Sequence, residues 1–137
     1  MNADMGLAVL HVATGIFFTT TGARKCFVAE TRGHVFALFD RLRVPRAAGW
    51  AVTAGELAGG LGLLAGCLTQ AAALGLLVIM AGAWRLSAWP GVKQKGLRGS
   101  ALLSSALCTA EAQLIVVLVA LALSGAGAYS LDTLLFG

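Results

Sequence analysis

The chain consists mainly of long apolar runs separated by short polar segments. Four such windows cover residues 5–23, 47–68, 71–89 and 101–124, and none contains more than one formal charge. Each is about 20 residues long, close to the roughly 17–25 residues that a helix needs to cross the hydrocarbon core of a bilayer. The ten-residue alternation typical of membrane β-strands is not visible. The pattern predicts an all-α integral membrane protein, a four-transmembrane-helix bundle forming one domain over residues 1–137.

The composition supports lipid as the solvent for most of this chain. Apolar residues make up 58% of the sequence and charged residues 12%, and the mean hydropathy is +0.86. A soluble domain has about 25% charged residues. The composition therefore argues against a soluble globular enzyme, and it excludes a disordered chain.

All ten Lys and Arg residues lie in or beside two of the connections, around residues 24–46 and 85–98. These are the first and third loops of a four-span protein, so they share one side, and the positive-inside rule places that side in the cytoplasm. We expect a multi-pass protein of the bacterial inner membrane with both termini facing outward. The basic loops would face anionic lipid head groups, so the pI of about 9.4 requires no nucleic acid.

The first loop contains a second kind of pattern. Apolar residues alternate with charged ones over about residues 34–43, ahead of Pro45. This spacing predicts a short amphipathic interfacial helix between the first two spans. A disordered basic loop is the alternative.

Small residues recur at helical spacing on the first two windows. The second window has Ala54, Ala58, Gly62 and Gly66 in steps of four, with Gly55 and Gly59 alongside. One face of the first window carries His11, Gly15, Phe18, Gly22 and Lys25. Rows of small residues allow membrane helices to approach closely, so we expect tight packing here.

Charged side chains inside the apolar windows are the candidate functional residues. At about 1.5 Å per residue, Glu56 and Glu111 would lie about 13 and 15 Å from the inner end, near the middle of the bilayer. Such groups usually face the bundle interior and mark function. We expect both carboxyl groups to form one hydrogen-bonded network with at least one of Lys25, Arg85 and His11. A purely structural network, snorkelling of Lys25 and Arg85, and a packing role for His11 remain open alternatives.

At this point the chain resembles the DoxX family of small four-helix bacterial membrane proteins. The resemblance rests on Gly15-x-x-Phe18-x-x-x-Gly22-x-x-Lys25, on the segment 56–61 (ELAGGL), on Glu111 and on the tail 123–132, and it runs from about residue 6 to 135. It implies a membrane subunit, since some members resemble the membrane part of a thiosulfate:quinone oxidoreductase and others accompany soluble redox proteins. A basic residue that the family often has after the second helix is replaced here by Thr69-Gln70.

Two functions follow as hypotheses. The first is a quinone-associated subunit that works with another membrane or soluble redox protein. In it, Glu56 and Glu111 relay protons, and His11, Lys25, Glu56, Arg85 and Glu111 surround the quinone. The second is a structural anchor or assembly subunit of a larger respiratory or photosynthetic complex. The sequence contains no ligand set for haem, an iron–sulfur cluster or another metal, so we expect quinone alone as cofactor.

Overall fold

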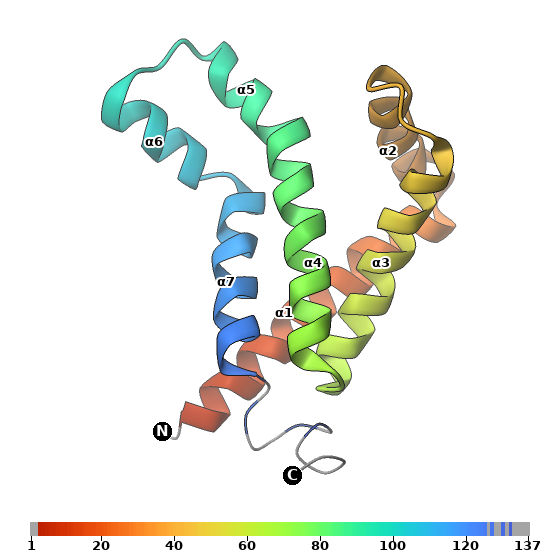
Figure 1. The fold of residues 1–137 in the computed structure, drawn as a ribbon, viewed down its shortest axis with the longest axis vertical. Helices are drawn as coiled ribbons and strands as arrows, with labels where there is room; N and C mark the ends of the chain where they lie inside the picture. The colour runs from red at the N-terminus through yellow and green to blue at the C-terminus, as the bar shows by residue number, and fades with distance from the viewer. Residues whose placement is uncertain (1–2, 126, 128–129, 131, 133–137) are drawn as a thin grey trace.

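The computed structural model describes residues 3–125, 127, 130 and 132, and all the regular secondary structure of this part of the chain is helical (Figure 1). The helices are, in order, α1 (Ala3–Phe27), α2 (Ala29–Arg41), α3 (Arg46–Ala65), α4 (Thr69–Ala83), the π-helical turn η1 (Trp84–Ala88), α5 (Trp89–Gln94), α6 (Gly99–Leu107) and α7 (Ala110–Ser124). The expected all-α class is therefore correct for the described residues.

Helices α1 and α3 form the tightest contact of the fold. They run antiparallel, and α1 presents glycine where the two backbones cross. A Cβ atom on Gly15 would lie 2.5 Å from the backbone nitrogen of Leu64, and one on Gly22 would lie 2.7 Å from that of Leu57. Real Cβ atoms do not approach a backbone this closely, so only glycine permits this separation of the helices.

A third glycine, Gly60, completes this contact from the α3 side. A Cβ there would overlap the backbone of Phe18 and Thr19 on α1. Phe18 fills the space beside it and is fully buried. The face of α1 that the sequence singled out, from His11 to Lys25, is thus the face that packs on α3.

Helices α4 and α7 form the second pair and close the core. Leu76 of α4 packs against Gly59 of α3. A Cβ atom added to Gly59 would lie 2.7 Å from the Cγ atom of Leu76. The side-chain amide of Gln70 donates a hydrogen bond to the Ala122 carbonyl (3.3 Å) and ties the start of α4 to the end of α7. The buried core joins both pairs through Phe18, Leu63, Ala73, Leu76, Met80, Leu118 and Leu121.

The expected single helix over 101–124 is two helices in the structure. Helices α6 and α7 meet at 68°, and α6 leans away from the bundle (Figure 1). The break follows from Thr109, whose extended backbone lets its hydroxyl accept from the Ala112 N–H (3.3 Å) and donate to the Ala106 carbonyl (2.9 Å). A threonine in this position starts a new helix instead of continuing the old one.

The third apolar window is one helix with a widened turn. It continues from α4 through η1 into α5 up to Gln94, beyond the expected end at residue 89. Pro90 has no N–H to donate to a carbonyl one turn earlier, and the helix relaxes into a π turn just before it.

The first loop does contain a helix, which begins earlier than the sequence indicated. Helix α2 spans Ala29–Arg41 rather than about 34–43, and none of its residues is fully buried. Trp50 of α3 holds it in place, because the Phe36 ring meets the indole edge-on (5.6 Å) and the Arg32 guanidinium lies 5.2 Å from it. Arg32 also donates to the Cys26 carbonyl (2.8 Å), which joins α2 to α1.

Within the described residues, two helices are long and apolar enough to cross a membrane: Asp4–Phe27 and Thr69–Gln94. The bent pair of α6 and α7 is a third if it counts as one span. Helix α3 is not among them, because its glycines and Glu56 lower its mean hydropathy. The structure thus supports a membrane protein, while four spans remain a proposal.

Described residues of the tail cover the turn between α3 and α4. Asp132 accepts hydrogen bonds from the backbone N–H groups of Leu68 (2.6 Å) and Thr69 (2.8 Å), and its own N–H donates to the Gly66 carbonyl. Burial alone would raise the pKa of the Asp132 carboxyl, but the N–H groups of Thr69 and Leu68 prevail and lower it. The Asp132 carboxylate therefore caps the first turn of α4.

We expect Gly60→Ala to separate α1 from α3 and to lower the free energy of unfolding by about 1–3 kcal/mol, the usual cost of overpacking. Thermal unfolding of the protein in detergent, followed by circular dichroism, measures this change. The matched control is Gly75→Ala on α4, where an added Cβ meets nothing within 4 Å. Equal stability of the Gly60→Ala variant and the wild type would contradict the close-packing argument.

We expect Asp132→Asn to lower stability by about 1 kcal/mol, the typical value of a helix cap. Because the pKa is lower in the folded state, the wild-type carboxylate stabilises the fold above about pH 4, the unfolded value. That contribution disappears as the pH falls through the folded pKa. Unfolding curves of both proteins between pH 3 and pH 7 should therefore converge at the acid end, and a gap that does not depend on pH would contradict this assignment.

Candidate functional site

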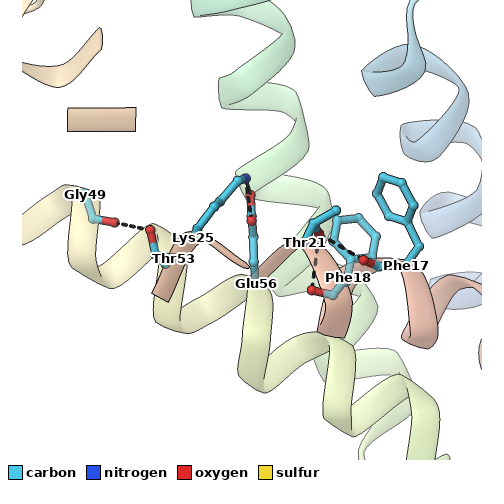
Figure 2. Close-up of polar contacts among 7 residues, drawn as sticks. All are labelled: Phe17, Phe18, Thr21, Lys25, Gly49, Thr53 and Glu56. Atoms are coloured by element: carbon cyan, nitrogen blue, oxygen red, sulfur yellow. Dashed lines mark hydrogen bonds and ion pairs between the residues drawn. The ribbon is translucent and has the colours of Figure 1, made fainter. Parts of the chain in front are cut away.

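A salt bridge joins the last turn of α1 to the middle of α3. The Lys25 ammonium donates to both carboxylate oxygens of Glu56, at 2.7 Å to Oε1 and 2.5 Å to Oε2 (Figure 2). Glu56 is 2% exposed and Lys25 is 25% exposed. The carboxylate is thus buried with its charge compensated, which is the condition for keeping it inside an apolar bundle.

The local sequence explains why these two side chains meet. Gly22, one turn before Lys25, brings α1 onto the backbone at Leu57, next to Glu56. The hydroxyl of Thr53, one turn before Glu56, donates to the Gly49 carbonyl (2.9 Å), so it does not compete for the carboxylate (Figure 2). The glycine contact therefore sets the distance between α1 and α3 that the salt bridge needs.

The Lys25–Glu56 pair lies in the wall of a cavity of about 410 Å³, which we call the inter-helix cavity. Its apolar lining comes from α2, α3, α4 and η1: Val35, Leu38, Phe39, Val52, Val78, Ile79, Gly82, Ala83 and Leu86. Its polar lining consists of Lys25, His34, Glu56, Ser87 and Glu111. Ligand sites of this size are commonly apolar with a few polar groups that orient the ligand.

Glu111 reaches this cavity because the fourth apolar window is bent. The break at Thr109 places Glu111 in the first turn of α7, where the positive end of the helix dipole favours a carboxylate. Glu111 is half-buried, and its side chain makes no hydrogen bond or ion pair within the described part of the chain. The expected network thus includes Lys25 and Glu56 but not Glu111, which shares the cavity without bonding to them.

The other two expected site residues lie elsewhere. His11 is 2% exposed, and its Nδ1 donates to the Leu63 carbonyl (2.8 Å) near the α3–α4 turn, while its Nε2 has no partner among the described residues. Arg85 is an exposed residue of η1 and does not line the cavity. The structure therefore brings together Lys25, Glu56 and Glu111, and it separates them from His11 and Arg85.

Two cavity residues were not anticipated from the sequence. His34 belongs to α2, which the sequence pattern treated as a surface element, and Ser87 belongs to the π turn. Pro90 was the available signal for Ser87, because a proline late in an apolar helix perturbs the preceding turn. No sequence signal indicated that α2 would close one side of a cavity.

Comparison with known proteins agrees with the membrane architecture. No curated protein and no solved structure matches the chain at a significant level. The family model described as DoxX matches residues 6–89, which include α1 to α4, η1, Lys25 and Glu56. Glu111 and the tail, which also carry the resemblance, lie outside this match. Because the match covers more than half of the chain, the expectation from the sequence is confirmed: this protein belongs to the DoxX family.

Proposed function

We propose that this DoxX protein is a quinone-associated membrane subunit and that the inter-helix cavity receives the quinone head group. One observation carries this proposal: the wall of a mainly apolar cavity of about 410 Å³ contains the Lys25–Glu56 pair and the side chain of Glu111, which has no bonding partner among the described residues. Apolar rings with polar oxygens need this combination of walls and polar groups.

The residues present fit such a head group. The Lys25 ammonium has three N–H donors, of which two are directed at Glu56, so one remains for a ring oxygen. The apolar side chains of α2 and α4 offer a surface for the ring and the isoprenoid chain. A bound quinone would supply two-electron, two-proton redox chemistry.

Three polar residues of the cavity have defined roles in this proposal. Lys25 binds and orients, because its charge is held in place by Glu56. Glu56 and Glu111 are the groups that can hold or release a proton in an apolar environment. His11 and Arg85, which lie away from the cavity, support the fold or contact lipid rather than the head group.

The electrons would come from another redox protein, either a membrane or a soluble subunit. We place the chain in the bacterial inner membrane, with α1, α3, the continuous helix from α4 to α5, and the bent pair α6–α7 as four spans. The antiparallel packing of α1 and α3 along their length supports α3 as a span, and the exposed side chains of α2 support an interfacial position.

The proposed topology predicts opposite labelling at the two ends of one helix. Gln70 and Gln94 are both exposed and stand near the start of α4 and at the end of α5. In a background with the three native cysteines replaced, Gln70→Cys should react with an impermeant maleimide from outside the cell. Gln94→Cys should react only after the membrane is opened, and the reverse pattern would overturn the assignment of sides.

The proposed chemistry predicts a loss of turnover without a loss of assembly. In Glu56→Gln, the amide keeps the shape and one acceptor for Lys25 but cannot carry a proton, so quinone reduction by membranes containing the protein and its partner should fall about a hundredfold. The control is Glu30→Gln on α2, outside the cavity. Full turnover of Glu56→Gln and Glu111→Gln, with normal co-purification of partner subunits, would favour the structural anchor instead.

A further inference from the structure

The side chains of the inter-helix cavity offer unequal numbers of unengaged hydrogen-bond donors and acceptors. Glu111 contributes a carboxylate whose oxygens have no hydrogen-bond donor among the described residues. Lys25 is the charged donor of the cavity, and Glu56 engages two of its three N–H groups. Within the described part of the chain, the cavity thus holds one ammonium donor that is not bonded to Glu56 and two Glu111 oxygens that no donor engages.

The remaining polar side chains do not change this difference between donors and acceptors. His34 and Ser87 can each donate or accept a hydrogen bond, so they adapt to whatever a ligand presents. Backbone groups of the lining helices are engaged in helical hydrogen bonds, apart from the loosened turn at η1 and the first turn of α7, where Thr109 caps the N–H of Ala112. Among its side chains, the cavity therefore has more acceptors to satisfy than donors to offer.

We propose that the inter-helix cavity binds the reduced, dihydroxy form of the ring in preference to the oxidised, dicarbonyl form, and that Glu111 sets this preference. The inference rests on the proposed function and adds the oxidation state of the preferred ligand. A hydroquinone donates two hydrogen bonds, one of which Glu111 accepts, whereas a benzoquinone only accepts and leaves the Glu111 carboxylate desolvated and unpaired. A buried polar group without a partner is costly, so the dicarbonyl form is penalised.

The bend between α6 and α7 is what makes this recognition possible. A straight helix over 101–124 would place Glu111 in the middle of a helix, with its backbone N–H engaged one turn back. The structure instead puts it in the first turn of α7, behind the Thr109 cap and at the cavity wall. At that position the Glu111 carboxyl group is available as an acceptor for a ligand in the cavity.

The test measures binding of a short-tailed benzoquinone and of its chemically reduced hydroquinone to the full-length protein in lipid nanodiscs. Equilibrium dialysis under argon gives the two dissociation constants. The wild type should bind the hydroquinone about tenfold more tightly, the equivalent of one good hydrogen bond. In Glu111→Gln this ratio should fall to about one, because the amide can donate to a carbonyl as readily as it accepts from a hydroxyl.

Two controls test whether the preference comes from a carboxylate in the cavity and from the hydroxyl groups of the ligand. Glu30→Gln makes the same chemical change on α2 outside the cavity and should leave the tenfold ratio intact. The dimethyl ether of the hydroquinone keeps the ring but cannot donate, so it should bind the wild type as weakly as the benzoquinone, and this measurement does not depend on any variant folding.

The binding measurements distinguish loss of the preference for the reduced form from loss of quinone binding itself. Equal affinities of the wild type for both oxidation states, or an unchanged ratio in folded Glu111→Gln, would overturn the preference and leave quinone binding in place. Failure of the wild type to bind either form would overturn both proposals.

Discussion

The close approach of α1 and α3 is the contact on which the rest of this structure depends. Lipid gives little hydrophobic incentive for helices to associate, so two membrane helices stay together through close van der Waals contact and a few polar bonds. Here Gly15, Gly22 and Gly60 remove the side chains that would hold the backbones apart. The same seam carries a polar contact at each end, from His11 to the Leu63 carbonyl and from Lys25 to Glu56.

This seam also explains why a charged pair can exist inside an apolar bundle. A buried carboxylate and ammonium lose their hydration, and only good geometry recovers that free energy. The backbone contact at Gly22 fixes the spacing of α1 and α3 next to the pair, and both oxygens of Glu56 are then satisfied by one ammonium. Each partner is thus held by a helix whose distance from the other is set by the glycine contacts.

The other half of the molecule, from α4 to α7, contains helices whose regular structure is interrupted. The continuous helix from α4 to α5 has a π turn before Pro90, and α6 meets α7 at 68°. Both irregularities lie in the half of the molecule that completes the inter-helix cavity, and both bring polar side chains, Ser87 and Glu111, to its wall. The cavity thus combines a wall from the closely packed helices α1 and α3 with a wall in which regular helix has been interrupted. Interrupted helices are where membrane proteins commonly place groups that meet a ligand.

Residue types and spacing alone determined the helical class, the membrane environment, the α1 face that packs on α3 and membership of the DoxX family. These properties follow from local patterns, since hydropathy, glycine spacing and charge bias are all readable along one dimension. They also predicted that Glu56 and Glu111, near the expected middle of the bilayer, form one network with at least one of Lys25, Arg85 and His11, and of these contacts the structure shows Lys25 with Glu56.

Tertiary structure alone decided which of the candidates share a cavity. Lys25 and Glu56 bond because the glycine contacts bring their backbones together, whereas Thr109 redirects the chain just before Glu111, which has no bonding partner in the described part of the chain. Depth along a helix could not separate His11 or Arg85 from these three, because depth ignores the direction in which each side chain points. Nor could it place His34 in the cavity, since the position of α2 depends on Trp50 of another helix. Contacts between segments distant in sequence carry that information, and such contacts exist only once the helices have packed.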